Sequence, residues 1–346
     1  MQKSTFDKNK LFVFISTYCW WFLRNFIKKS KRCNKCLASE NFTALKNGTC
    51  KLCIDYQQKT ENPDIKKEIQ LQNKSEFNSF LTSIKKKKIY HVLLMLSGGK
   101  DSAYILNRLQ QEFPLLNILC LFVNNGFSSP YALSNAYHVA DKLKVDLIVS
   151  NSNVNDFKKE FRKAFLNLNG QGSAGVVDFT DGNMIFEIGT QIAKQMDIPC
   201  VVGGLSWVQV NQILNLESFI QEKEGCPPTV FPLAAWHTNE FEIRKEVKEK
   251  KLMLPGSDNP VISNNELIMP MCAMDFLNIG YCSFEPEFSQ MIREGKSKRK
   301  VWLYNFELLE FMAKKGILNS DINKTLAKLN LNLNDIVIYN LKGELL

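Results

Sequence analysis

Short apolar runs alternate with amphipathic stretches from Tyr90 onward. The runs predict buried strands over residues 90–96, 118–123, 145–150 and 198–202. Between them, large apolar residues recur at helical spacing and predict helices. Continuous apolar strands that alternate with helices are typical of a parallel sheet covered on both faces. With right-handed crossovers, the prediction is an α/β fold with a doubly wound parallel sheet.

The distribution of apolar, polar and cysteine residues along the chain predicts five segments. The regular alternation spans residues 89–215, where we expect a nucleotide-binding domain. Residues 1–32 form an apolar and basic leader, and residues 33–53 hold paired cysteines. Residues 54–88 are a polar linker with room for one helix, and residues 216–346 form a mostly helical region for the substrate. A chain of 346 residues suits a core domain with small appendages.

Composition narrows the class of protein. With 45% hydrophobic and 23% charged residues, the chain is neither wholly disordered nor collagen-like. The net charge of +9 suits a phosphate-rich substrate, RNA or an anionic membrane surface, although solvated surface also accounts for short basic runs. Four of the ten cysteines fall close together. This spacing favours a reducing cytoplasm and one local metal site over a disulfide framework.

The leader contains the apolar stretch LFVFISTYCWWFL at residues 11–23. Thirteen residues are fewer than the roughly 20 that a membrane-spanning helix needs. Basic residues follow, and no small-residue cleavage site does. Two interpretations stand: residues 11–27 lie in a membrane interface, or they pack on the body of the protein. We expect a cytoplasmic protein, which under the first interpretation is peripheral at the inner membrane.

The sharpest motif follows the first predicted strand and precedes the first predicted helix. Two glycines allow a tight turn whose N–H groups face an anion, and the helix points its positive end at the same place. Hydroxyl donors and a lysine add to this phosphate site, while an aspartate suits a helix cap or Mg²⁺ at the phosphates. The motif consists of Ser97, Gly98, Gly99, Lys100, Asp101 and Ser102. It has neither the Walker spacing nor that of a dinucleotide fingerprint.

This hexamer resembles the SGGxDS signature of the PP-loop ATP pyrophosphatases, also called adenine nucleotide alpha hydrolases. The resemblance covers roughly residues 90 to 205. It implies that ATP and Mg²⁺ bind at the loop and that a substrate oxygen becomes an adenylate as pyrophosphate leaves. A nitrogen or sulfur nucleophile then displaces AMP. In that scheme Lys100, Asp101 and Ser102 are catalytic, and the whole loop binds nucleotide.

Two further sites extend this resemblance. After the second strand the family often carries an acidic residue, whereas this chain has Asn124, which can hydrogen-bond the nucleotide but supplies no charge for a metal. Gly203 and Gly204 end the fourth strand where the family closes over the adenylate, although a simple strand-end turn is the alternative. Asp178, Asp181 and Glu187 flank the predicted mouth of the sheet as candidates for Mg²⁺ binding or acid–base chemistry.

Two CxxC pairs lie ahead of the loop, separated by 13 residues: Cys33, Cys36, Cys50 and Cys53. Such pairs converge on one tetrahedral ion, and four thiolates leave no open position. The prediction is a structural Zn²⁺ site, with an iron–sulfur cluster or no metal as alternatives. Asn47-Gly48, just before the second pair, suits a turn.

Paired cysteines ahead of the loop occur in two groups of PP-loop enzymes. The chain is most similar to the bacterial N-acetyl sugar amidotransferases of surface-polysaccharide and lipopolysaccharide pathways, through Lys46–Cys53 and Gly126–Pro130 with Asn135. That resemblance implies a sugar or sugar-nucleotide substrate whose N-acetyl oxygen is replaced by ammonia. Because the sequence carries no glutaminase signature, a separate glutaminase subunit is the expected partner.

The alternative is tRNA thiolation, with tRNA as partner. That chemistry commonly uses additional paired cysteines in the middle of the chain, where this sequence has none. Cys272 and Cys282 are a loose substitute, and core thiols are the competing interpretation. Aromatic residues do not interleave with the basic runs as on an RNA-binding face. A third reading, nucleotide binding without turnover, conflicts with the complete loop motif.

Overall fold

The computed structural model describes residues 12, 14–58, 63–84, 88–151, 154–257 and 265–337, the side chains of residues 63–66 excepted. Leu11 and Val13 of the apolar stretch in the leader lie outside these ranges. The centre of the molecule is a six-stranded sheet with the order β5-β4-β3-β6-β8-β7. All neighbours are parallel except β7, which is antiparallel to β8. The strands are β3 (Val92–Met95), β4 (Ile118–Val123), β5 (Asp146–Ser150), β6 (Val201–Val202), β7 (Ile220–Gln221) and β8 (Thr229–Val230).

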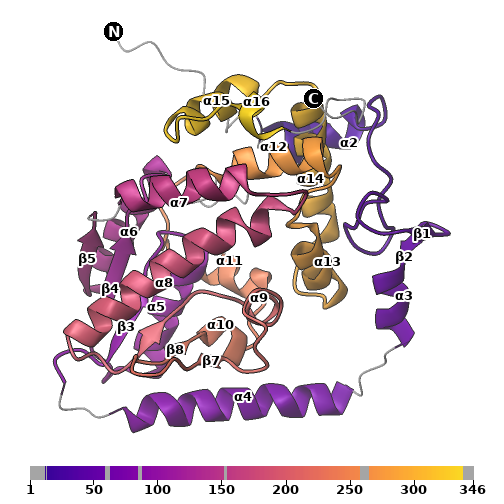
Figure 1. Cartoon of the computed structure of the whole chain (residues 1–346). Coiled ribbons are helices and arrows are strands. Elements are labelled where there is room, and N and C mark those ends of the chain that lie inside the picture. The colour runs from indigo at the N-terminus through magenta and orange to yellow at the C-terminus, as the bar shows by residue number, and fades with distance from the viewer. Residues whose placement is uncertain are drawn as a thin grey trace.

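Helices cover both faces of this sheet, as the continuous apolar strands predict (Figure 1). Leu93 and Met95 of β3 join the core on the side of α7 (Val154–Leu166) and α8 (Val177–Gln195). Val92 and Leu94 join the core on the side of α5 (Lys100–Glu112) and α6 (Pro130–Leu143). Alternate residues of one strand therefore supply two cores, and the fold is a doubly wound α/β structure.

The sheet continues beyond residue 215 into the region where the sequence pattern becomes irregular. Strands β8 and β7 add to the edge of β6, although each spans two residues. Helices make up most of the remaining described C-terminal residues. Helices α10 (Pro232–Ala235) and α11 (Glu240–Glu249) join the same core as α5 and α6. At one end of the sheet lie α12 (Ile268–Asn278), α13 (Glu285–Arg293), α14 (Arg299–Lys314), α15 (Asn319–Ala327) and α16 (Leu333–Ile336) (Figure 1). Before residue 215 the chain also forms η2 (Ser173–Gly175) and α9 (Trp207–Ile213).

The cysteine-bearing segment forms a small module on the far side of the C-terminal helices from the sheet (Figure 1). It contains the hairpin β1 (Leu45–Lys46) and β2 (Thr49–Cys50), followed by α3 (Lys51–Gln58). Asn47 and Gly48 form the hairpin turn with φ values of 51° and 76°, which confirms the turn prediction. The module is called the cysteine module below and comprises residues 33–58.

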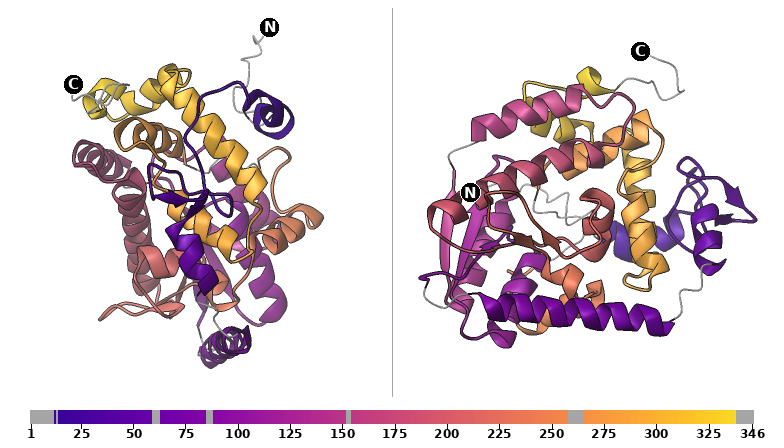
Figure 2. Two further views of the ribbon diagram at one scale, coloured as in Figure 1. Left: turned by 90° about the vertical axis from the view of Figure 1, so that its right-hand side faces the viewer. Right: turned by 60° about the horizontal axis from the view of Figure 1, so that its bottom comes forward.

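The polar segment between the cysteine module and the sheet is mostly helical. Helix α4 (Pro63–Ser83) runs along one side of the molecule and links the cysteine module to the sheet domain (Figures 1 and 2). Its C-terminal half is anchored by Phe77, which is fully buried and meets the rings of Phe113, Phe219 and Trp236 at centroid distances of 6.3, 5.8 and 5.4 Å. These edge-to-face contacts fix the linker on the core.

The leader packs on the C-terminal helices through one face. It forms a π-helical turn, η1 (Ile15–Cys19), which continues into α2 (Trp20–Leu23). Phe12 and Trp20 are buried against Leu308 of α14. No helix of the described residues is long and apolar enough to cross a membrane.

Candidate nucleotide site and cysteine cluster

The loop from Ser97 to Gly99 lies at the point where the strand order of the sheet reverses. It follows β3, the central strand, whose chain continues to β4 on one side while β6 lies on the other. At such a switch point, the crossovers diverge and leave a crevice at the carboxyl ends of the strands. Helix α5 begins at Lys100, directly after the loop, so its N-terminal N–H groups open into this crevice.

The backbone conformation and close packing at position 98 allow only glycine. Its φ is +72°, and a Cβ atom there would lie 1.9 Å from the carbonyl oxygen of Ala132 in α6. The side chain of Asn135 in α6 also holds the loop against this helix, since its Nδ2 donates to the Gly98 carbonyl at 3.2 Å. Asn135 Oδ1 in turn accepts from the backbone of Leu254 and from Ser257 Oγ. The first glycine of the motif thus lets the loop lie directly on α6.

The polar side chains of the loop hold one another. Ser102 Oγ donates to the Gly99 carbonyl at 3.1 Å and lies 3.3 Å from Ser97 Oγ. The N–H of Gly99 donates to Ser97 Oγ at 3.3 Å. Lys100 Nζ contacts both carboxylate oxygens of Asp101, at 2.9 and 2.8 Å. Because both side chains are partly exposed, this ion pair can open to a ligand at small cost.

A cavity of about 250 Å³ opens beside the loop. Its lining brings together Gly98, Gly99, Lys100 and Asp101 with groups from β6–α9, α11, α13 and α14. Among these are Gly204, Gln209, Glu240, Arg244, Glu287, Phe288 and Trp302. The C-terminal region therefore closes over the loop of the sheet domain, and the cavity joins a phosphate-binding turn to aromatic and charged side chains.

Of the other residues expected to bind nucleotide, the structure places Gly204 at the cavity and gives Gly203 and Asn124 other contacts. Gly204 lines the cavity, whereas a Cβ at Gly203 would meet Phe186 and Phe231 at 2.7 and 2.8 Å, so that glycine serves packing. Asn124 is not among the described residues that line the cavity. Its side chain spans from Asn151 Oδ1, at 2.8 Å, to the N–H of Gly126, at 3.0 Å. It therefore shapes the loop after β4.

Interacting carboxyl groups extend from Asp101 through Glu287 and Asp178 to Asp181. Burial, together with the charges of Asp178 and Asp101, raises the pKa of Glu287 to about 8 against the opposing charge of Lys100. Burial, with the charge of Asp181, raises the pKa of Asp178 to about 7. Burial also raises the pKa of Asp181 to about 6. Such groups hold protons near neutral pH or bind a cation that replaces those protons.

Of the three acidic residues expected at the mouth of the sheet, two join this cluster. Asp178 and Asp181 occupy the first turns of α8, and Asp181 accepts from Asn125 Nδ2 and Asn265 Nδ2 at 2.9 and 2.8 Å. Glu187 is exposed further along the same helix. Among the described residues, no three carboxylates place ligand oxygens within 4.8 Å of one another. A Mg²⁺ ion here would take part of its shell from phosphates and water, as Mg²⁺ commonly does.

Sequence patterns did not single out the opposite wall of the cavity. Glu240 receives Nε and Nη2 of Arg244 at 2.8 and 2.7 Å. Burial opposes its ionisation, but the charge of Arg244 and the Ser297 hydroxyl lower the pKa of Glu240 below its ordinary value. Trp302 Nε1 donates to Glu240 Oε2 at 3.2 Å. The wall consists of a carboxylate and a guanidinium from α11 and an indole from α14, two helices that only the fold brings together.

The four paired cysteines converge as predicted. All four are buried, and their sulfur atoms lie within 4.8 Å of one another. The Sγ atoms of Cys36 and Cys50 are 3.6 Å apart, close to the roughly 3.8 Å edge of a tetrahedron with Zn–S bonds of ~2.3 Å. Burial opposes ionisation of Cys33, but backbone N–H donors to its sulfur lower the pKa to about 7. The set fits a structural zinc ion, and a tetrathiolate also suits an iron–sulfur centre.

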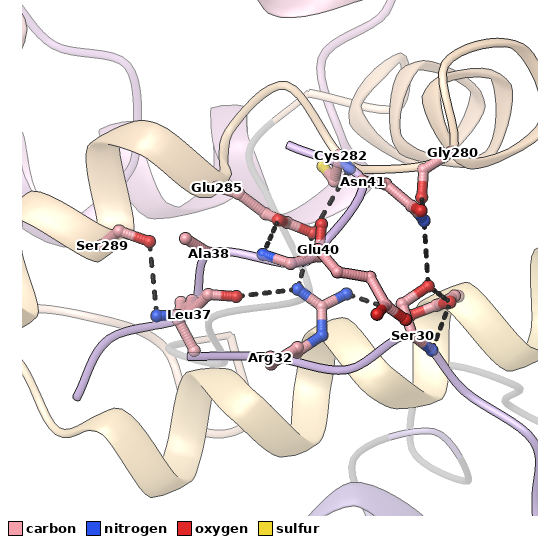
Figure 3. A network of polar contacts seen from close by, with 12 residues as sticks. Ser30, Arg32, Leu37, Ala38, Glu40, Asn41, Gly280, Cys282, Glu285 and Ser289 are labelled. Carbon is pink, nitrogen blue, oxygen red and sulfur yellow. Dashed lines mark hydrogen bonds and ion pairs between the residues drawn. The ribbon is translucent and has the colours of Figure 1, made fainter. Parts of the chain in front are cut away.

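Charged side chains attach the cysteine module to the C-terminal helices (Figure 3). Arg32, at its edge, donates through Nη1 to Glu285 of α13 at 2.6 Å and through Nη2 to Glu310 of α14 at 3.0 Å. The same guanidinium donates to the Leu37 carbonyl at 3.0 Å. In return, Arg299 of α14 donates to backbone carbonyls within the CxxC turn, at 2.8 and 2.6 Å. The module is thereby fixed to the helices that line the cavity.

Comparison with known proteins gives partial likenesses. No model of a known protein family matches the chain. An uncharacterised protein of Methanocaldococcus jannaschii is 38% identical over 84 residues, which are 24% of this chain and 30% of that protein. The chain thus matches less than a third of the length of this curated relative.

Solved structures align over more of the chain, at low identity. A U34-tRNA thiolase from Methanococcus maripaludis, with its [4Fe-4S] cluster, is 16% identical, with a TM-score of 0.38 over 78% of this chain and 88% of that one. NMN synthetase from Francisella tularensis is 14% identical, with a TM-score of 0.38 over 76% and 97%. NH3-dependent NAD synthetase from Campylobacter jejuni is 14% identical, with a TM-score of 0.36 over 70% and 96%.

Proposed function

We propose that the chain is a cytoplasmic PP-loop ATP pyrophosphatase that forms AMP and pyrophosphate. The observation that carries the proposal is the loop Ser97–Ser102, which lies at the switch point of a parallel sheet and opens into a cavity. Its glycine backbone, the N-terminus of α5 and Lys100 gather positive potential where pyrophosphate would form. Asp101, with Glu287 beside it, would hold Mg²⁺, which neutralises phosphate charge.

The acceptor that best suits the far wall is an N-acetyl sugar or a sugar nucleotide. The rings of Phe288 and Trp302 lie 3.9 Å apart between centroids, and both line the cavity with the Glu240–Arg244 pair. Sugars combine apolar faces with hydroxyl edges, so aromatic rings beside fixed hydrogen-bonding groups match them. This supports an amidotransferase of lipopolysaccharide or related surface-glycan synthesis, with ammonia supplied by a separate glutaminase subunit.

The proposed reaction has two steps. The oxygen of the N-acetyl group forms a bond to the α-phosphorus of ATP, and the bond from that phosphorus to pyrophosphate breaks. Ammonia then adds to the activated carbon, and AMP leaves with the former amide oxygen, which gives an acetamidino group after loss of a proton. Asp178 can accept a proton in the second step, since its pKa of about 7 lies near neutrality.

Thiolation of tRNA is the second candidate, because the fold brings two further cysteines together. The Sγ atoms of Cys272 and Cys282 lie 3.5 Å apart. Both side chains are buried in the core, and burial together with Cys272 raises the pKa of Cys282 well above its ordinary value. A sulfur carrier needs an accessible thiolate. The pair therefore has the character of core thiols, which favours amidation.

The test is to supply ATP, an ammonium salt and a panel of N-acetylated sugar nucleotides, since ammonium bypasses the glutaminase. Pyrophosphate and AMP should appear in equal amounts with a sugar in which NH replaces one oxygen. The variant Lys100→Met should lose roughly 10²–10³ in rate, whereas Cys272→Ala should keep it. Release of ADP and orthophosphate would refute the pyrophosphatase assignment. Turnover only with tRNA and a sulfur donor would refute amidation and favour tRNA thiolation.

A further inference from the structure

The leader has two faces of different character. The inner face packs Phe12 and Trp20 on α14, and Trp20 Nε1 donates to Glu307 at 3.1 Å. Arg24 strengthens this attachment, since its Nε and Nη2 donate to the two carboxylate oxygens of Glu307 at 2.7 and 2.6 Å. A bidentate pair of this kind fixes orientation. The leader is therefore held rigidly, and its outer face points away from the body.

The outer face carries two groups of exposed aromatic side chains. Neighbouring ring centroids lie 5.1 to 5.9 Å apart, from Phe14 to Tyr18, from Trp21 to Phe22 and from Phe22 to Phe26. Each of these side chains is more than half exposed, and Phe26 is 74% exposed. We call the set the aromatic face: Phe14, Tyr18, Trp21, Phe22 and Phe26. Exposed aromatic groups of this extent mark an interaction surface.

A basic pocket lies at the end of the aromatic face. Its volume is about 490 Å³, and its lining includes Arg24, Lys28, Lys29, Lys31, Arg32 and Arg299. Glu307 is the sole acidic lining residue in the described part of the chain. Three of the cations hold the protein together, through Glu307, through Glu285 with Glu310, and through the CxxC carbonyls. Lys28 and Lys31 are exposed and point their charge at solvent.

We propose that the aromatic face docks on an anionic membrane leaflet, with lipid phosphates in the basic pocket. Charge complementarity selects this occupant: a cluster of cations beside an apolar patch matches a surface that is anionic above and apolar below. The chemistry of the side chains agrees, since tryptophan and tyrosine prefer the membrane–water interface. A second copy of this chain would instead bring two sets of like charges together. The proposal stands independently of the catalytic one.

Flotation of the full-length, metal-loaded protein with vesicles tests the proposal. It should float with vesicles of phosphatidylcholine mixed with phosphatidylglycerol and stay behind with phosphatidylcholine alone. The double variant Lys28→Gln/Lys31→Gln should weaken partition about 25-fold, since each lysine near an anionic surface is worth about fivefold. The matched control Lys142→Gln/Lys223→Gln removes two exposed lysines near the sheet and should float as the wild type does.

The aromatic contribution has its own pair of variants. Trp21→Ser/Phe26→Ser should weaken partition about tenfold or more, because apolar area no longer leaves water. Tyr137→Ser removes a 55% exposed aromatic from α6 and should change nothing. All variants should release pyrophosphate in solution at the wild-type rate. Equal flotation with both vesicles, or variants that match their controls, would overturn the proposal. A dimer without vesicles that Trp21→Ser/Phe26→Ser dissociates would assign the face to self-association instead.

Discussion

Arg32 Nη1 lies 2.6 Å from Glu285 Oε1, and the two side chains are 2% and 0% exposed. Glu285 begins α13, and two residues later the same helix presents Glu287 to the cavity beside the loop. The cysteine module and the candidate catalytic cavity therefore share one short helix. The metal site is therefore connected to the nucleotide site by the Arg32–Glu285 ion pair, and not only by the covalent backbone.

Loss of this buried ion pair should destabilise the protein strongly. Arg32→Met leaves Glu285 and Glu310 buried without their cation, and we expect a loss of about 3–5 kcal/mol in the free energy of unfolding. Urea denaturation measures it. Lys163→Met is the matched control, because its pair with Glu160 is exposed and 3.6 Å long, and it should cost less than about 1 kcal/mol. Similar losses in both variants would contradict the role of Arg32.

The loop conformation should depend on Gly98. Gly98→Ala forces a Cβ against the Ala132 carbonyl at a φ of +72°, so the loop must move away from α6. We expect pyrophosphate release to disappear and the unfolding midpoint to fall. Gly182→Ala in α8 is the control: nothing lies within 4 Å of its Cβ, and a helical alanine should stabilise by about 0.5–1 kcal/mol. An active Gly98→Ala variant would show that the loop does not rest on α6.

The carboxyl group of Glu287, which lines the cavity, should make stability depend on pH. Its pKa rises from an ordinary 4.5 to about 8 on folding, so the folded state binds the proton more tightly. This contribution is present below the ordinary value and is lost as pH increases towards 8. Glu287→Gln should therefore flatten the decline in unfolding free energy between these values.

The comparison needs the metal-loaded protein without nucleotide, measured by urea denaturation at several pH values. Glu187→Gln removes an exposed carboxylate from α8 and controls for the change in net charge. Addition of Mg²⁺ with ATP should reduce the difference between wild type and Glu287→Gln at high pH, because the cation replaces the proton. A decline that is as steep in Glu287→Gln as in the wild type would place the responsible group elsewhere.

The cysteine cluster should hold one metal ion. Elemental analysis should find about one zinc per chain, as four thiolates form one closed tetrahedral site. Cys53→Ser should lose the metal and loosen the cysteine module, whereas Cys120→Ser, in β4, should retain it. If the analysis instead finds stoichiometric iron, together with visible absorbance, the site holds an iron–sulfur cluster and the thiolation alternative is strengthened.

The sheet could be predicted from the sequence where burial is complete. Strand β4 has the predicted bounds, because an unbroken apolar run leaves one solution. Strands β7 and β8 span two residues each and carry no such pattern, since their pairing depends on a sheet edge that exists only after folding. Helix α4 lies in the linker where the sequence leaves room for one helix, but its bounds could not be predicted, because only a few large apolar side chains, such as Phe77 and Leu81, pack it on the core.

The candidate site also has parts that the sequence predicts and parts that it does not. The loop and the cysteine pairs are contiguous motifs, so their local geometry follows from spacing. Glu240, Glu287 and Trp302 belong to three different helices, and in the sequence each looks like an ordinary helical residue. Asn124 occupies a position that the resemblance associates with nucleotide, yet its amide is engaged with Asn151 and Gly126. Tertiary contacts, which no spacing encodes, decide such positions.

The attachment of the cysteine module also sets an order of events on the ribosome. Arg32 is synthesised 253 residues before Glu285 and 278 before Glu310. At a synthesis rate of about 5–20 residues per second, the first of these partners emerges roughly 13–50 s later. Until then the nascent module can fold around its metal but has no surface on which to dock, and the guanidinium of Arg32 stays in water. The segment that is made early reaches its final place late, after the C-terminal third has left the exit tunnel.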